Sequence, residues 1–309
     1  MGIIVNKYKQ NFFQRFNKDP AIPFYGAADF EDLVCERGTF RNSAGEDICY
    51  FNYYYQGYKT GKLILFCHGL GPGHTAYLAE IETLCRAGYR VLTLDYAGCG
   101  GSGGERLTSV NAPTRDVTEL AEHLQITEEI VPVGHSLGGY TALNAVRLLP
   151  NAHKAVVISG FIGVSDLMMG FGKLRLLANS VKRYEKKLMP QYGSADNFAY
   201  LASTRDRILW IHSSDDPVVN YKHNGGKVKK IKNPNVRVIT AENKKHNPQY
   251  AREALDDMNA WLGEYYKLVN EKKLVALEEK KAFFNDKPVS EMTKQDPAVY
   301  SEILDFIES

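Results

Sequence analysis

The sequence predicts an α/β fold, a mostly parallel central sheet with helices on both faces. From residue 62 onward, short apolar runs alternate with amphipathic helical stretches. Strands that are apolar on both faces belong to parallel sheets covered by two layers of helices. The 309 residues are enough for one large α/β domain with a sizeable core. In such sheets, functional groups are expected just after the carboxyl ends of the strands.

Residues 1–30 are rich in aromatic side chains and are interpreted as an N-terminal arm tucked onto the domain. An interfacial membrane helix is the alternative, but its polar face would be too mixed. Residues 32–41 and 47–55 read as two strands that form a hairpin across Asn42-Ser43-Ala44-Gly45-Glu46. The predicted sheet therefore begins with an antiparallel pair.

The alternating part supplies the other elements in order. We expect strands at 63–67, 91–94, 130–133, 155–158, 208–211 and 236–239, and helices at 77–87, 113–124, 140–149 and after Pro248. Gly88 is a stop signal for the first of these helices.

The strand at 130–133 leads into Gly134-His135-Ser136-Leu137-Gly138, a G-x-S-x-G pattern followed by a helical run. A strand that turns into a helix within two residues strains the backbone of the central residue, and the flanking glycines have no Cβ to collide. The Ser136 hydroxyl would lie at a helix N-terminus, where a developing oxyanion is favoured. Ser136 is therefore a candidate nucleophile.

A serine nucleophile needs a base and an orienting acid, and both residue types follow later strands. Asp215 and Asp216 come after the strand ending at residue 211, and His246 comes after the strand ending at residue 239. The spacing and the following Pro217 favour Asp216 as the acid over Asp215. Asp166 is a further alternative. The rival histidines, His153, His212 and His223, do not follow a strand at the right end of the chain, and His68 and His135 are expected to support the site.

Five segments together resemble the α/β-hydrolases over residues 60–262, most closely the esterase, monoacylglycerol lipase and lysophospholipase group. They are His68-Gly69-Leu70-Gly71, Asp95 to Ser102, Gly134 to Gly139, Asp216-Pro217-Val218-Val219, and His246. The resemblance implies Ser136 as nucleophile, His246 as general base and Asp216 as acid. It also implies an oxyanion hole from the backbone amides of Leu70 and Leu137, and no cofactor. Lys245 stands before His246 where the family often has a small residue or glycine.

About 45 residues separate the strands at 155–158 and 208–211, so we expect a small cap at 161–206 between core segments 31–160 and 207–262. Apolar residues at helical spacing, Leu174, Leu177, Val181, Tyr184 and Leu188, would dock one cap helix onto the core. Phe161, Met168, Met169, Phe171, Phe198 and Tyr200 either face the cleft, as substrate-binding residues for an apolar acyl or alcohol group, or form the small core of the cap. Residues 263–309 form a helical extension, with helices at 274–284 and from Asp296-Pro297, that could pack on the domain, on a second subunit or over the cleft.

Composition narrows the partners and the compartment. The net charge of +2 gives no reason to expect nucleic acid, and the lysines at 227, 229, 230 and 232 read as a solvated face. Five cysteines without C-x-x-C spacing favour reduced thiols, and the first apolar run is too short for a signal peptide or membrane span. A cytoplasmic protein is expected.

Residues 98–103 match G-x-G-x-x-G, but residues 104–108 do not open an amphipathic helix and no acid stands at the expected distance, so a flexible loop is favoured over a dinucleotide site. The sequence contains no H-E-x-x-H motif and no close His/Cys cluster, so a metal site is not expected.

The expected function is hydrolysis of carboxylic esters, with an apolar small-molecule substrate, through an acyl intermediate on Ser136. Cleavage of thioesters or amides by the same residues is the alternative within enzymes. A non-catalytic binding protein on the same scaffold is the alternative outside them. An epoxide hydrolase or dehalogenase would want aspartate at position 136.

Overall fold

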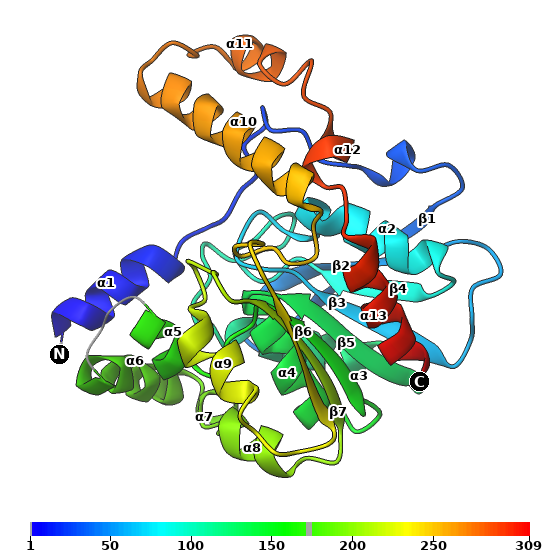
Figure 1. Cartoon of the computed structure of the whole chain (residues 1–309), viewed down its shortest axis with the longest axis vertical. Helices are drawn as coiled ribbons and strands as arrows, with labels where there is room; N and C mark the ends of the chain where they lie inside the picture. Colours follow the sequence, from blue (N-terminus) through cyan, green and yellow to red (C-terminus); the bar gives the residue numbers. More distant parts are fainter. Residues whose placement is uncertain (1, 171–174) are drawn as a thin grey trace.

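The structure is a computed structural model that describes residues 2–170 and 175–309. Within these residues, eight strands form one sheet in the order β1-β2-β4-β3-β5-β6-β7-β8 (Figure 1). The strands are β1 Val34–Arg41, β2 Asp47–Tyr54, β3 Lys62–Cys67, β4 Arg90–Leu94, β5 Glu129–His135, β6 Lys154–Ile158, β7 Arg207–Ser213 and β8 Val236–Ala241.

The pairing of the strands confirms the predicted hairpin and the predicted parallel sheet. β1 pairs antiparallel with β2, which pairs antiparallel with β4, and all the remaining neighbours are parallel. The parallel register sets Cys67 opposite Gly134 and Ser213 opposite Ala241. The loops that follow β3, β5, β7 and β8 therefore start at the same edge of the sheet.

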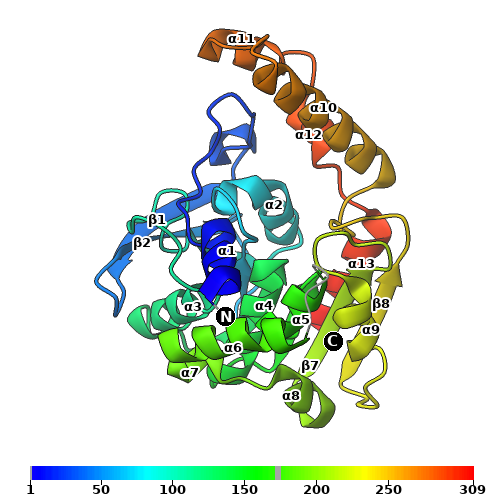
Figure 2. The ribbon, with the colours of Figure 1, turned by 90° about the vertical axis from the view of Figure 1, so that its left-hand side faces the viewer.

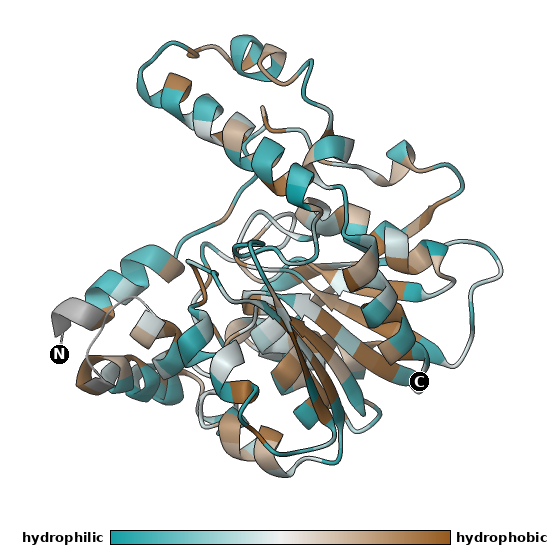
Figure 3. Cartoon of the chain, in the orientation of Figure 1, coloured by the Kyte–Doolittle hydropathy of each residue, from teal (hydrophilic) through white to brown (hydrophobic). Residues whose placement is uncertain are grey.

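Helices cover both faces of the sheet. The helices of the described residues are α1 Gly2–Phe12, α2 Leu78–Arg86, α3 Ala112–His123, α4 Leu137–Leu148, α5 Val164–Gly170, α6 Arg175–Leu188, α7 Pro190–Gly193, α8 Asn197–Ser203, α9 Gly225–Val228, α10 Arg252–Asn270, α11 Leu277–Ala282, α12 Val289–Met292 and α13 Pro297–Glu308, with short 3-10 turns at Ala27–Asp29, His74–Tyr77 and Tyr221–His223. α3 and α4 pack on one face, over Trp210, and α2 and α13 pack on the other. The strands between them are coloured mostly hydrophobic in Figure 3.

The last helix, α13, completes the core. The Asp296 side chain caps its N-terminus by accepting hydrogen bonds from the amides of Ala298 and Val299, as the Asp-Pro pair predicts. Ile303 and Ile307 are fully buried against the sheet, and each such side chain stabilises the fold by about 1.5–3 kcal/mol. The boundary expected at residue 262 falls inside α10, so one helix continues from the core segment into the extension.

The segment at 161–206 forms α5 to α8, and α1 of the N-terminal arm packs against α6. α6 turns Ala178, Val181 and Glu185 inward, and the Tyr8 hydroxyl donates a 2.7 Å hydrogen bond to the Glu185 carboxylate. The expectation for Leu188 is wrong, because this side chain lies at the end of α6 and is 42% exposed. Leu174 lies outside the described residues.

α10 and α11 stand away from the sheet (Figures 1 and 2). Tyr265 of α10 is buried against Phe284 and against Ala21 of the N-terminal arm. The Tyr265 hydroxyl also donates to Asp19, at 2.7 Å. The arm and the C-terminal extension, which are distant in sequence, thus form one small cluster of their own. No helix in the part of the chain that the structure describes has the length and apolar character needed to cross a membrane.

Candidate active site

Ser136 occupies a strained turn between β5 and α4. Its φ is 58° and its ψ is −117°, outside the regions that L-residues ordinarily adopt. The turn is possible because of its glycines. A Cβ on Gly134 would lie 2.1 Å from the carbonyl oxygen of Gly138, and one on Gly138 would lie 1.9 Å from that of Cys67. Both positions therefore require glycine, as the motif indicated.

His246 and Asp216 extend from Ser136 in one hydrogen-bonded chain. His246 Nε2 lies 2.9 Å from Ser136 Oγ, and His246 Nδ1 lies 2.8 Å from Asp216 Oδ2. Ser136 and His246 are partly exposed, whereas Asp216 is buried. The structure therefore brings together the three residues that follow β5, β7 and β8. This arrangement can pass the serine proton to an imidazole whose other nitrogen faces a carboxylate.

Asp216 is held in the ionised form. Its Oδ1 accepts hydrogen bonds from the amides of Val218 and Val219, at 2.8 and 2.9 Å. Burial alone would raise the pKa of this carboxyl. The hydrogen bonds from His212 and His246 outweigh burial and hold the pKa well below its ordinary value. A charged Asp216 fixes the proton of His246 on Nδ1 and leaves Nε2 free to accept.

His212 lies behind Asp216 and is not a second base. It is fully buried, and its Nε2 lies 2.8 Å from the Val219 carbonyl and 3.2 Å from Asp216 Oδ2. Because both neighbours are acceptors, this nitrogen carries the proton, and Nδ1 accepts from the Trp210 indole. Sequence reasoning did not find this supporting contact. The sequence feature that could have indicated it is the position of His212, at the end of a buried strand and four residues before Asp216.

His135 supports the backbone of His246. Its Nε2 donates to the His246 carbonyl at 2.9 Å, and its Nδ1 accepts from the Tyr77 hydroxyl at 3.0 Å. Burial, together with the neighbouring His246, lowers the pKa of His135 to about 3, so the ring is neutral. His68 is also buried, and it donates to the Gly69 carbonyl in the loop after β3. Tyr77 was not anticipated from the sequence.

The backbone amides of Leu70 and Leu137 were expected to donate to a negative oxygen. Leu137 is the first residue of α4 and follows Ser136 directly, and Leu70 lies in the loop after β3. Among the described residues, neither of these N–H groups donates to a protein acceptor. A free amide at a helix N-terminus is a favourable partner for an anion.

The alternative acids have other partners. Asp215 accepts from the Ser213 hydroxyl at 2.6 Å and pairs with Lys245 Nζ at 3.1 Å, and Asp166 pairs with Lys227. Lys245 itself has a φ of 50°, so it adopts the left-handed conformation that glycine would adopt more easily. Asp215 thus anchors the strained loop that carries His246, rather than contacting the histidine.

The apolar residues expected to bind substrate are packed between the insertion and the sheet. Phe161 is 2% exposed and stacks on Tyr140, with ring centroids 4.4 Å apart. Met168 is buried and Met169 is partly buried in the same cluster, which includes Leu137. Phe171 lies outside the described residues. This packing corresponds to the alternative in which these residues form a core. That core also includes Leu137 and Tyr140 of α4.

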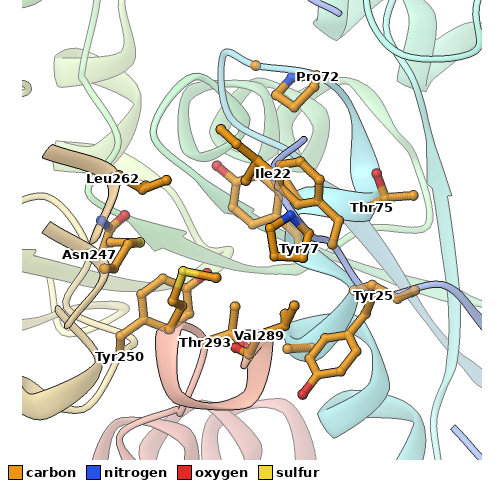
Figure 4. Close-up of a pocket in the computed structure, with 18 of the residues that line it drawn as sticks. Ile22, Tyr25, Pro72, Thr75, Tyr77, Asn247, Tyr250, Leu262, Val289 and Thr293 are labelled. Atoms are coloured by element: carbon orange, nitrogen blue, oxygen red, sulfur yellow. The ribbon is translucent and has the colours of Figure 1, made fainter. Parts of the chain in front are cut away.

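A pocket lies beside the loop after β3, and Leu70, Gly71 and Pro72 of that loop line it. The space between its walls and at its open side amounts to about 830 Å³. Its walls come from that loop, the start of α2, the N-terminal arm, α10 and the segment around α12 (Figure 4). No sequence signal distinguished these lining residues from an ordinary core.

The glycine-rich loop at 98–103 wraps around Asp95. Gly100 has a φ of 48°, and a Cβ on it would lie 2.3 Å from the Asp95 carboxylate. Asp95 also accepts from the Gly101 amide at 2.7 Å and pairs with His74 at 2.8 Å. The glycines therefore serve the turn. No group of three or more His, Cys, Asp or Glu side chains suited to a metal ion occurs in residues 2–170 and 175–309.

A family model described as "Alpha/beta hydrolase family" matches residues 64–261. Among curated proteins, an epoxide hydrolase of Caballeronia sordidicola is 32% identical over 31% of this chain and 30% of its own length. The sn-1-specific diacylglycerol lipase ABHD11 of Xenopus laevis is 28% identical over 43% of this chain and 44% of its own length. The chain thus matches less than half of the length of these relatives.

The solved structure of an esterase of Pyrococcus furiosus, Pf2001, superposes with a TM-score of 0.55 at 18% identity, covering 84% of this chain and 98% of that one. At this identity, the match shows the same fold. Any assignment of a reaction therefore depends on the geometry of Ser136, His246 and Asp216.

Proposed function

Because the chain belongs to the alpha/beta hydrolase family, we propose that it is a serine hydrolase that cleaves carboxylic esters. The observation that carries the proposal is the chain of two hydrogen bonds from Ser136 Oγ through His246 to Asp216. A serine hydroxyl is a weak nucleophile at neutral pH, and this contact is what activates it.

In the proposed reaction, His246 Nε2 takes the Ser136 proton as Oγ attacks the ester carbonyl carbon. The carbonyl oxygen becomes negative and is stabilised by the amides of Leu70 and Leu137, each such donor being worth about 10²- to 10³-fold in rate. Collapse of the intermediate breaks the bond to the alcohol, which leaves with the proton from His246. Water then attacks the acyl-serine with His246 again as base, releasing the acid and restoring Ser136. Asp216 stabilises the imidazolium in both steps.

The named relatives support an ester as the substrate, since they include a diacylglycerol lipase and a probable esterase from rice. The epoxide hydrolase match does not favour epoxide opening, because residue 136 is serine and not aspartate. Thioesters and amides remain substrates for the same residues, and only substrate comparison separates them. The five cysteines are free thiols, four of them buried, which supports a reducing compartment such as the cytoplasm.

The test is labelling of the purified protein with a fluorophosphonate, which reacts with an activated serine. Wild type is expected to be labelled, and Ser136→Ala and His246→Ala are expected to lose the label. His153→Ala is the matched control, because that side chain is 67% exposed and pairs with Asp206, away from Ser136. Hydrolysis of matched p-nitrophenyl esters, thioesters and anilides would then rank the bond types. A folded wild type that takes no label would favour the binding-protein alternative.

A further inference from the structure

The pocket beside the loop after β3 is lined in part by the loops that carry the candidate active-site residues. Leu70, whose amide is a proposed oxyanion donor, lines the pocket together with Gly71 and Pro72. Asn247, the residue after His246, lines it as well. Tyr77 forms part of the wall, and its hydroxyl reaches His135, which holds the His246 backbone. A group attached to an ester carbonyl at Ser136 therefore has this pocket as a neighbour.

Segments outside the sheet domain close the pocket. The pocket wall includes residues 22–25 of the N-terminal arm, Met258 and Leu262 of α10, and Val289 and Met292 at α12. Figure 4 labels Ile22, Leu262 and Val289 among them. The contact between Tyr265 and Asp19 ties α10 to the arm. The wall is therefore an ordered part of the fold.

The lining chemistry selects an uncharged apolar group. Among the described residues that line the pocket, none is Asp, Glu, Lys or Arg, and most are aliphatic or aromatic. Two methionines, Met258 and Met292, give a wall that adapts to different apolar shapes. By contrast, Phe161 and Met168 of the insertion are already packed against Leu137 and Tyr140. The apolar pocket thus lies under the extension, whereas the described apolar residues Phe161 and Met168 of the insertion are already packed.

We propose that the pocket formed by the N-terminal arm, α10 and α12 binds the apolar acyl or alcohol chain of the ester. The proposal rests on the function proposed above and names its substrate class, esters with an uncharged hydrocarbon chain. Burial of one methylene contributes about 0.8 kcal/mol, which is about a fourfold change in kcat/KM. The specificity for chain length is therefore set by the arm and the C-terminal extension.

The test compares two ester series. One varies the acyl chain from acetate to octanoate with p-nitrophenol as the alcohol, and the other varies the alcohol from ethyl to octyl with acetate as the acid. Wild type is expected to gain up to about fourfold in kcat/KM per methylene in the series whose variable chain enters the pocket. The series that shows the gain identifies the side of the ester.

Met258→Trp fills the pocket and is expected to lower the octanoate-to-acetate ratio of kcat/KM at least tenfold, or the corresponding octyl-to-ethyl ratio. Asn259→Trp is the matched control, because the next residue of α10 is exposed, and it should keep the wild-type ratio. Leu262→Ala enlarges the pocket and should shift the optimum to longer chains. If Met258→Trp proves unstable in a thermal melt, the Leu262→Ala shift decides the question.

Equal ratios in Met258→Trp, Leu262→Ala and wild type, with Ser136 labelled by fluorophosphonate, would overturn the pocket proposal and leave the proposed function intact. An unlabelled, inactive wild type would overturn the proposed function instead. In that case, calorimetry with 1-octanol tests whether the pocket binds an apolar chain, independently of any reaction at Ser136. Octanol binding that is lost in Met258→Trp supports it, and no binding to wild type refutes it.

Discussion

Replacing Asp216 by asparagine tests the proposed catalytic chain most directly, because the substitution changes one oxygen to an NH₂ group with almost no change in shape. In the structure, Oδ1 accepts from the amides of Val218 and Val219, and Oδ2 lies 2.8 Å from His246 Nδ1. The Asp216 carboxylate therefore acts only as a hydrogen-bond acceptor, and its neighbours are the donors.

Asparagine fails in either orientation. With its oxygen toward Val218 and Val219, its NH₂ donates to His246 Nδ1, so the imidazole proton moves to Nε2 and can no longer accept from Ser136. With its oxygen toward His246, the NH₂ meets two amide N–H groups, and buried donors left without acceptors cost about 1–3 kcal/mol each. We expect kcat to fall about 10⁴-fold, which corresponds to about 5.4 kcal/mol in the barrier.

The assay is kcat and kcat/KM on p-nitrophenyl acetate, with a thermal melt to show that the variant is folded. Asp215→Asn is the matched control, since Asp215 contacts Ser213 and Lys245 and does not contact His246. This variant should stay within about tenfold of wild type, a loss of about 1.4 kcal/mol or less. Folded Asp216→Asn with activity within tenfold of wild type, while Ser136→Ala is inactive, would refute the role given to Asp216.

Four further substitutions probe the surroundings of the catalytic chain and the stability of the fold. His135→Phe leaves the His246 carbonyl without its donor, so kcat should fall about 10-fold or more through misplacement of the base, with fluorophosphonate labelling slowed in parallel; unchanged labelling kinetics would argue against this support. Burial raises the pKa of Glu80 to about 7, above its ordinary value of 4.5, so only the unfolded state ionises between these two values and stability falls as pH rises through this window. In wild type, the free energy of unfolding from urea melts should be about 3 kcal/mol lower at pH 8 than at pH 5, and Glu80→Gln should remove most of this difference. The same difference in both proteins would contradict the role given to Glu80. Gly138→Ala drives a Cβ against Cys67 and should abolish labelling and lower the melting temperature, whereas Gly263→Ala, on an open face of α10, should raise stability by up to about 1 kcal/mol.

Local patterns were sufficient for the sheet and for the three candidate catalytic residues. Buried strands need continuous apolar runs, and loops that follow parallel strands meet at one edge, so Ser136, His246 and an aspartate at 215 or 216 were expected to lie close together. The contact with His246 Nδ1 is made by Asp216. The glycines around Ser136 reflect the same kind of constraint, because a strained turn leaves no room for a Cβ. The hairpin at 42–46 and the helix start at Asp296 were also visible locally.

The supporting and binding residues depend on contacts between distant segments. His212 and Tyr77 take their roles from the groups that they touch, and no spacing in the sequence encodes those contacts. His135 was expected to support the site, but its partner, the His246 carbonyl, was not predictable from the sequence. The same holds for the insertion, where Phe161 could have faced a cleft or a core with the same apolar side chain.

The sequence by itself determined the fold class, the strained serine turn and the order of the acid and base, because these depend on periodicity, backbone sterics and chain direction. Only the tertiary structure decided that α13 covers the sheet, while α10 and the N-terminal arm enclose the apolar pocket beside Leu70. The physical reason is that an amphipathic helix specifies that one face must be buried and leaves open which surface will bury it.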